Sequence, residues 1–245
     1  MTHSKTQSGR TRWLAPLIGA VGGGAAYALA IRPWHLRWGA TAEEAITPLA
    51  GDDLVPNAAY VTTRAATIQV PLGAVWPWLV QMGQGRAGFY TYDRLEQMVG
   101  ADIRSTDLIV PELQQLAVGD TIPLSPVGGP TVALLDPGRT LVLFETMDLR
   151  TGQSIPSLPP IRWAMDWTWS FTLRPTPAGA TRLLVRTRAA YRPRALLGLA
   201  LPVLLEPAHF VMERGMLLGI KRRAETGNIV PTTADAGTVG TAAAL

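Results

Sequence analysis

The sequence predicts an α+β fold, with an antiparallel sheet of about six strands covered on one face by a long C-terminal helix. Three observations predict this fold. Period-two or β-rich stretches occupy residues 60–70, 118–124, 131–135, 140–148, 163–173 and 182–191. Turn signals at 136–139 and 175–180 join two pairs of these stretches into hairpins. A helix is expected to begin at Pro207, in its first turn, and to run to about Glu225, long enough to cover the sheet.

An uncharged run of 19 residues, 13–31, precedes the first strand. As a helix rising about 1.5 Å per residue, it would span about 28 Å, close to the hydrocarbon thickness of a bilayer. Basic and tryptophan residues flank it on both sides: Lys5, Arg10, Arg12, Arg32, Arg37, Trp13, Trp34 and Trp38. We therefore predict a single-pass transmembrane helix at 13–31 and a membrane localisation, with the side of the domain left open. The alternative is a cleaved signal peptide, because residues 28–30 have the small-x-small form of a cleavage site.

The remaining chain divides by composition. A basic segment at 1–12 comes before the transmembrane helix, and a linker at 32–58 with a short helix at 42–46 comes after it. One domain is expected at 59–226, with two short helices at 75–82 and 92–99 after its first strand. The tail at 227–245 is rich in Thr, Ala and Gly and is expected to be disordered.

Composition narrows the chemistry. Charged residues make up 16% of the chain, against roughly 25% in an ordinary soluble domain, as expected for a membrane segment or a large buried surface. The chain has no cysteine, which excludes disulfides and a thiolate zinc site. The three histidines are too scattered in the sequence to predict a metal centre, so no metal and no cofactor is expected.

Two stretches resemble a known superfamily. They read VPNAAYVTTRAATIQVPLGAVWPWLVQMGQGRAGFYTYDRLEQMVG and LLEPAHFVMERGMLLGIKRRAE. They are similar to the bacterial START-like (SRPBCC) superfamily, which includes polyketide cyclases and dehydrases, and more narrowly to its membrane-associated, uncharacterised branch. The resemblance spans residues 31–225. It implies a helix-grip fold with a cavity between sheet and C-terminal helix, commonly used for hydrophobic ligands. It implies no particular reaction, since one fold hosts many functions.

The strand at 163–173 carries the clearest candidate site, because apolar and polar residues alternate along it. Its apolar face includes Trp163, Met165, Trp167 and Trp169. Such large side chains either fill a core or line a cavity. On the C-terminal helix, His209, Met212, Met216 and Ile220 share one face, which favours the cavity. We expect these residues to bind a ligand and the tryptophan face to lie against the helix.

Glu213 lies within the same helical arc, one turn from His209. A carboxylate among apolar side chains needs a partner, either His209 or an arginine. Two interpretations remain open: a structural ion pair, or an acid–base pair at the cavity rim with the pKa of Glu213 raised by burial. His209 and Glu213 are thus the candidate catalytic residues. Glu145 is a further ligand-binding candidate, although the sequence leaves open which sheet face it occupies.

Residues 83–88 read GQGRAG and formally satisfy the dinucleotide pattern G-x-G-x-x-G. A helix rather than a strand is predicted before them, so we expect a turning loop and no nucleotide site. The resemblance suggests that Tyr90 and Tyr92, just after this loop, close one end of the cavity. Trp76 completes the set of ligand-binding candidates.

Five arginines share one parity at the end of the sheet pattern: Arg182, Arg186, Arg188, Arg192 and Arg194. We expect them to form a solvated outer face, with Asp166 of the neighbouring strand opposite or diagonal to Arg188. Contact with anionic lipid headgroups is the alternative. Nucleic-acid binding is not expected, because no aromatic side chains accompany the arginines on that face.

Together these features predict a membrane-tethered domain that binds a hydrophobic small molecule or lipid. One alternative is a cyclase- or dehydrase-type enzyme acting on an apolar substrate. Another is an interaction module without a ligand. The binder leads because no motif identifies a catalyst. The identity of the ligand and the oligomeric state stay open.

Overall fold

The computed structural model describes residues 27–91, 105–125, 128–155 and 162–227. The predicted basic segment, the helix at 92–99 and all but the first residue of the tail lie outside these ranges. Of the predicted transmembrane run, Tyr27–Ile31 is described, as a π-helical turn labelled η1. Within the described ranges, no helix has both the length and the apolar character that a bilayer crossing requires.

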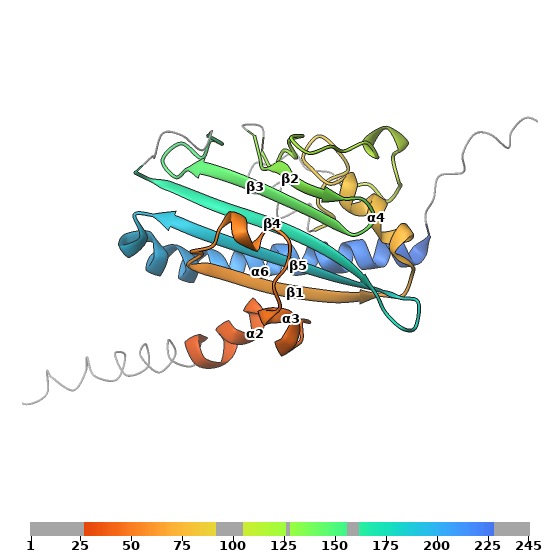
Figure 1. Ribbon diagram of the computed structural model, residues 1–245, viewed down its shortest axis with the longest axis horizontal. Helices are drawn as coiled ribbons and strands as arrows, with labels where there is room; N and C mark the ends of the chain where they lie inside the picture. The colour runs from red at the N-terminus through yellow and green to blue at the C-terminus, as the bar shows by residue number, and fades with distance from the viewer. Residues whose placement is uncertain (1–26, 92–104, 126–127, 156–161, 228–245) are drawn as a thin grey trace, which may run out of the picture.

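A five-stranded antiparallel sheet forms the centre of the molecule, in the order β1-β5-β4-β3-β2. The strands are β1 (Tyr60–Ile68), β2 (Thr131–Asp136), β3 (Thr140–Asp148), β4 (Ala164–Pro175) and β5 (Thr181–Arg192) (Figure 1). The sixth predicted strand, at 118–124, is wrong. The segment forms an isolated bridge, Thr121 to Thr131, and two backbone hydrogen bonds with Val132 of β2, but no strand. Gly119 has a φ of 96°, and Pro123 has no N–H for a further ladder bond.

Both predicted hairpins are present. Between β2 and β3, the Arg139 N–H donates to the Asp136 carbonyl at 3.0 Å, and Gly138 has a φ of 79°. Proline and glycine at the two central positions are the residues that a type II turn requires. The longer loop at 176–180 joins β4 to β5. The resulting register places Phe171 of β4 between Leu141 and Val185, and all three are buried.

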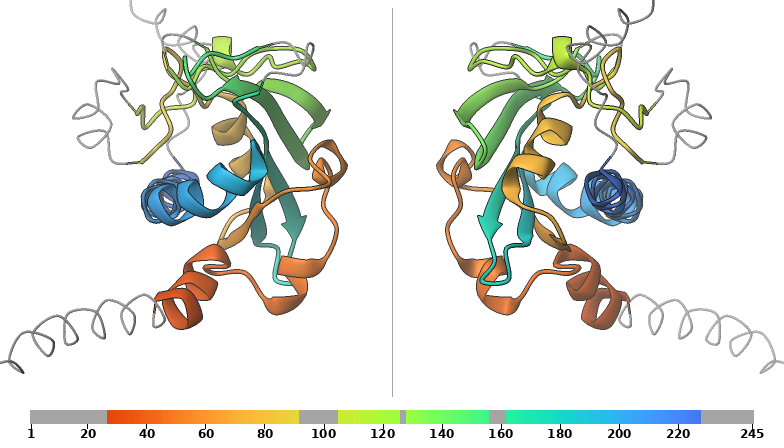
Figure 2. Two further views of the ribbon diagram at one scale, coloured as in Figure 1. Left: turned by 90° about the vertical axis from the view of Figure 1, so that its left-hand side faces the viewer. Right: turned by 90° about the vertical axis from the view of Figure 1, so that its right-hand side faces the viewer.

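One face of the sheet is covered by α6 (Arg194–Thr226), which lies against it together with α4 (Leu72–Val80) (Figure 2). The predicted start at Pro207 is wrong, since the helix begins at Arg194. Proline removes one backbone donor, but the preceding run ALLGLALPVLL is rich in the helix formers alanine and leucine and continues the helix through it. The helix ends at Gly227, whose φ of 67° suits a helix C-terminus.

The hydrophobic core fills the space between the sheet, α4 and α6. Its buried members include Trp78 of α4, Phe171 of β4, and Met216, Leu217 and Ile220 of α6. Five antiparallel strands curved around one long C-terminal helix form a helix-grip arrangement, as the resemblance implied.

The opposite, outer face of the sheet is covered by residues 41–58, which we call the strap (Figures 1 and 2). The strap contains α3 (Ala42–Ile46), at the position of the predicted short helix, and the 3₁₀ turn η2 (Asp52–Leu54). Thr41 and Glu44 form a capping box that fixes the start of α3. Before the strap, α2 (Arg32–Leu36) packs beside β1 and α6.

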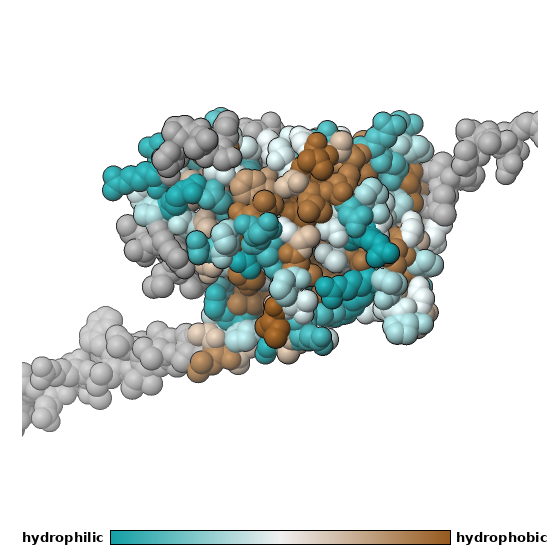
Figure 3. All heavy atoms as spheres, viewed as in Figure 1, coloured by the Kyte–Doolittle hydropathy of each residue, from teal (hydrophilic) through white to brown (hydrophobic). Residues whose placement is uncertain are grey.

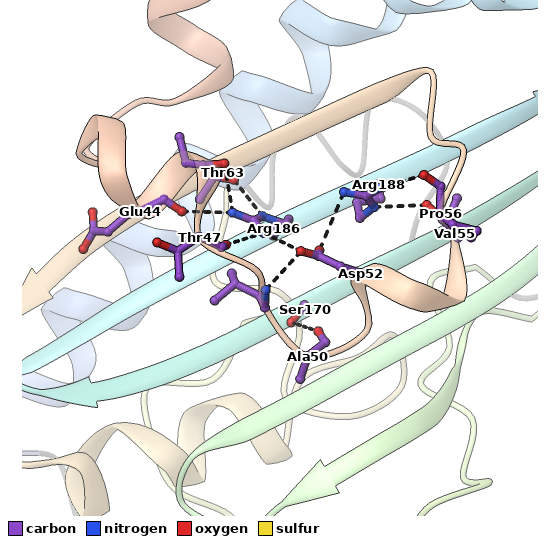
Figure 4. A network of polar contacts seen from close by, with 12 residues as sticks. Glu44, Thr47, Ala50, Asp52, Val55, Pro56, Thr63, Ser170, Arg186 and Arg188 are labelled. Atoms are coloured by element: carbon purple, nitrogen blue, oxygen red, sulfur yellow. Dashed lines mark hydrogen bonds and ion pairs between the residues drawn. The ribbon is translucent and has the colours of Figure 1, made fainter.

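The prediction of a solvated arginine face is wrong, because arginines of β5 hold the strap (Figure 4). Arg186 is buried and binds Asp52 at 2.6 Å, while Arg188 donates to the carbonyls of Val55 and Pro56. Arg182 forms two hydrogen bonds, at 2.8 and 2.7 Å, with the carboxylate of Glu44. The alternation in the sequence therefore identified the face but not its cover.

Asp166 has the strand register that the sequence predicted, but its ion-pair partner differs from the one expected. Asp166 lies opposite Ala190, so Arg188 and Arg192 are its two diagonal neighbours. Its carboxylate pairs with Arg192, at 2.6 and 3.0 Å, and accepts a further hydrogen bond from Thr146. Arg188 turns instead toward the strap.

Candidate ligand cavity

A cavity of about 210 Å³ lies at the end of the sheet where β1 begins, between the strands and α6. Its walls come from β1, β4, β5 and α6: Tyr60, Met165, Trp167, Thr187, Ala189, Tyr191, Glu206 and His209. Most of these side chains are apolar or aromatic, which is typical of a small-molecule site. The helix-grip arrangement thus leaves a partly open cavity between the sheet and α6.

The tryptophan strand faces α6, as predicted. Trp167 lies opposite Ala189 of β5, and both line the cavity. Trp169 is half-buried against the core, and its Nε1 donates to Glu213 of α6 at 2.9 Å. Trp163 lies one residue before β4 and is also half-buried.

The predicted helix face does not line the cavity as a whole. His209 does so, whereas Met216 and Ile220 are fully packed in the core about two and three turns further along. Met212 is half-buried and lies outside the lining. The cavity therefore lies nearer the start of α6 than expected, because core side chains fill the middle of the grip.

The remaining ligand-binding candidates lie elsewhere. Trp76 is half-buried against the core. Tyr90 is buried next to Trp78 and beneath the guanidinium of Arg223, at 4.8 Å from the ring centroid, so it packs rather than lines the cavity. Tyr92 lies outside the described residues.

Glu213 is buried on α6 and paired with Arg64 of β1. The same carboxylate accepts hydrogen bonds from Trp169 and from Thr187, the latter at 3.2 Å. Burial alone would raise the pKa of Glu213, but the nearby His209 and Arg64 hold it at about 2. Of the two interpretations that the sequence left open, the structural ion pair fits these surroundings, whereas the raised pKa of the acid–base alternative is not found.

His209 is engaged at both ring nitrogens. Its Nδ1 lies 2.9 Å from the Tyr60 hydroxyl and 3.3 Å from Arg64 Nη1. A guanidinium can only donate, so in the neutral ring Nδ1 accepts and the proton belongs on Nε2, which is 3.5 Å from the Glu213 carboxylate. His209 therefore presents no free nitrogen as a base toward the cavity.

Arg64 was not singled out in the sequence, although a signal exists. It occupies the apolar parity of β1, between Thr62 and Ala66, and such a charge must find a buried partner. Its guanidinium is fully buried, binds the Glu213 carboxylate, and donates through Nε to the His35 carbonyl at 2.8 Å. Arg64 thus ties α6 to α2 across the edge of the sheet.

A second acidic residue of α6, Glu206, was missed as well. Its carboxylate lines the cavity and accepts two hydrogen bonds from Arg32 of α2, at 2.9 and 2.8 Å. No local pattern links residues 174 positions apart. Close by, the Tyr27 hydroxyl lies 3.0 Å from His35 Nε2, so η1 and α2 meet the polar wall of the cavity.

Glu145 lies on the face that is turned toward α6, opposite Trp167. Its carboxylate accepts hydrogen bonds from the Ser154 hydroxyl and from Trp167 Nε1, the latter at 3.0 Å. It lines a second cavity, of about 300 Å³, at the edge of the sheet. In the part of the chain that the structure describes, no three acidic or histidine side chains come together as a metal site.

The sequence matches no protein-family model and no curated protein. Among solved structures, protein NE0264 from Nitrosomonas europaea is 13% identical with a TM-score of 0.39, over 74% of this chain and 99% of that one. Protein MLL2253 from Mesorhizobium loti is 16% identical with a TM-score of 0.36, over 69% and 98%. The di-domain ARO/CYC StfQ from the steffimycin biosynthetic pathway is 16% identical with a TM-score of 0.37, over 68% and 50%.

These likenesses are loose, and the helix-grip description follows from the strand order and the position of α6. The narrower resemblance, to a membrane-associated branch, stays a prediction.

Proposed function

We propose that the protein binds a hydrophobic small molecule or lipid in the cavity of about 210 Å³ between the sheet and α6. The observation that carries the proposal is a partly open cavity with aromatic and aliphatic walls, supplied by Met165, Trp167, Ala189 and Tyr191. Polar side chains in its wall are already paired: Glu206 binds Arg32, and the Tyr60 hydroxyl lies 2.9 Å from His209 Nδ1. An apolar ligand therefore displaces no hydrogen bond from the wall.

We further propose that residues 13–31 tether this domain to a membrane. The described chain begins at the end of that run, and Figure 3 shows hydrophobic residues at its lower left, where the chain emerges. Leu29, Ile31 and Trp34 are exposed there. Arg32, in the same turn, binds the cavity residue Glu206, so the tether ends beside the cavity. A ligand with low water solubility would then have a short path from bilayer to binding site.

The cyclase or dehydrase alternative finds less support in this geometry. A catalyst needs a free acid or base within reach of its substrate. Within the described lining of the cavity, His209 has both nitrogens engaged and Glu206 holds Arg32 with both oxygens. Binding without turnover is the simpler function for such a cavity.

Native mass spectrometry of the full-length, detergent-extracted protein tests the binding. The wild-type protein should carry a co-purified apolar molecule, and Ala189→Phe should remove it, because the added ring occupies the cavity. Ala190→Phe is the matched control, since this neighbour faces the opposite side of β5. Equal ligand content in both variants, or no bound mass in the wild-type protein, would refute the proposal.

Fractionation tests the tether independently. Deleting residues 1–26 should move the protein from the membrane fraction to the soluble fraction. If the full-length protein isolated from cells begins near Ile31, the run is a signal peptide and the tether is wrong.

A further inference from the structure

The second cavity lies where β3 leaves its pairing with β2 and pairs instead with residues 153–155. Its volume is about 300 Å³, and none of its residues lines the first cavity. The lining consists of Gly129, Thr131, Phe144, Glu145, Thr146, Ser154 and Ile155. The Glu145 carboxylate and the Ser154 hydroxyl meet there, whereas Phe144, Thr131 and Thr146 belong to the outer face of the sheet.

Glu145 differs from the other buried carboxylates of the described chain. Four are buried: Glu145 (8% exposed), Asp148 (7%), Glu206 (1%) and Glu213 (2%). Each of the last three pairs with an arginine. Arg150 Nε lies 3.8 Å from Asp148 Oδ1, Arg32 binds Glu206, and Arg64 binds Glu213. Among the described residues, no arginine forms an ion pair with Glu145.

The partners of Glu145 are neutral donors, the hydroxyl of Ser154 and Nε1 of Trp167. A buried carboxylate without a positive partner carries a desolvation cost that hydrogen bonds from neutral groups offset only in part. A carboxylate offers about four acceptor positions, so two remain for further donors. Glu145 also lines the cavity, from which a donor can reach it.

We infer that this cavity binds the cationic end of a small organic molecule, an ammonium or guanidinium group, with Glu145 as its counter-charge. The register turns Glu145 toward α6 and Phe144 toward the outer face, so the counter-charge comes from Glu145 alone. The Ser154 hydroxyl donates to that carboxylate, and its oxygen can accept a hydrogen bond from the ligand. A calcium ion is a poorer match, because it takes six to eight oxygen ligands and this lining offers one carboxylate.

Trp167 makes the site observable. Its ring lines the first cavity while its Nε1 donates to Glu145 in the second. A cation that binds Glu145 changes the charge felt by that N–H and should shift its indole resonance in a ¹H–¹⁵N NMR spectrum. The chain has eight tryptophans, and Trp167→Phe assigns the relevant signal.

The experiment titrates n-butylammonium chloride into the full chain in detergent micelles. The Trp167 indole signal should shift saturably, while the other indole signals stay in place. Neutral n-butanol should cause no such shift. Potassium chloride and calcium chloride at matched ionic strength form the inorganic arm, and a saturable shift with either salt would overturn the assignment to an organic cation.

Two variants complete the test. Glu145→Gln keeps the size of the side chain and should weaken butylammonium binding at least about tenfold, whereas Glu112→Gln, at an exposed carboxylate, should not. Unaltered binding in Glu145→Gln, or no saturable shift in the wild-type protein, would overturn the inference.

Discussion

Arg186 of β5 and Asp52 of the strap form an ion pair on the outer face of the sheet, with Nη1 2.6 Å from Oδ2. The rest of the guanidinium donates to three strap carbonyls and to a hydroxyl of β1: Glu44 O, Ala45 O, Thr47 O and Thr63 Oγ1 (Figure 4). Few side chains can donate in so many directions at once, which is why an arginine occupies this position. Arg186 therefore connects the strap to the centre of the sheet.

Replacing Arg186 with Met should destabilise the fold. The methionine keeps an apolar stem but leaves Asp52 and the strap carbonyls without their donor, at a cost of about 3–5 kcal/mol. Thermal unfolding followed by circular dichroism should show a melting temperature lower by on the order of 10 °C. Arg139→Met, at an exposed arginine in the β2–β3 turn, is the control and should change stability by less than about 0.5 kcal/mol. Equal melting temperatures for the two variants would contradict this role.

The outer face shows a limit of sequence patterns. Alternation along 182–191 correctly placed the arginines on one face, because side chains of a strand alternate strictly. It could not show what covers that face, since water, lipid headgroups and the carbonyls of a strap all accept hydrogen bonds from arginine. The covering segment lies far away in the sequence: Glu44 of the strap and Arg186 of β5 are 142 positions apart.

The cavity shows a related limit. The apolar faces of the tryptophan strand and of α6 were predictable, and both are turned toward each other. Whether a given apolar side chain fills a core or lines a cavity depends on packing from all sides. Thus Met216 proved to be core while Ala189, a small residue without any sequence signal, lines the cavity.

The pairing of Glu213 should make stability fall in acid. The pKa of Glu213 drops from 4.5 to about 2 on folding, so between these values the unfolded chain binds more protons. The stabilisation is complete above about pH 4.5 and is lost as the pH falls toward about 2, with a total of roughly 3 kcal/mol. Unfolding free energies measured from about pH 5 to about pH 2.5 should show this decline.

Glu213→Gln should remove that part of the pH dependence. It leaves the buried Arg64 without a counter-charge and should cost about 3–5 kcal/mol at neutral pH. The difference in stability between wild type and variant should therefore shrink as the pH falls. A constant difference across the range would show that the carboxylate is not ionised in the folded protein.

Arg32 and Glu206 should behave as a coupled pair that joins α2 to the cavity wall. Arg32→Ala leaves Glu206 unpaired beside the apolar cavity and should cost about 1–3 kcal/mol, less than for a fully buried pair because Arg32 is partly exposed. A double-mutant cycle with Glu206→Gln should give a coupling energy of about 1–2 kcal/mol. Arg37→Ala, at an exposed arginine just after α2, is the matched control. Additive effects of Arg32→Ala and Glu206→Gln would show that the pair does not stabilise the fold.

The close approach of α6 to the loop after α4 gives a prediction with opposite signs at two glycines. A Cβ at Gly219 of α6 would lie 1.9 Å from the Tyr90 carbonyl oxygen, so Gly219→Ala must push the helix away from that backbone. We expect a loss of about 1–3 kcal/mol.

At Gly73, in the first turn of α4, no atom lies within 4 Å of the added Cβ. Gly73→Ala should therefore stabilise the protein by about 0.5 kcal/mol, because alanine restricts the unfolded chain more than glycine. Chemical denaturation of the two variants measures both changes in unfolding free energy. If Gly219→Ala stabilises the protein, α6 and the Tyr90 backbone are not in the close contact described here.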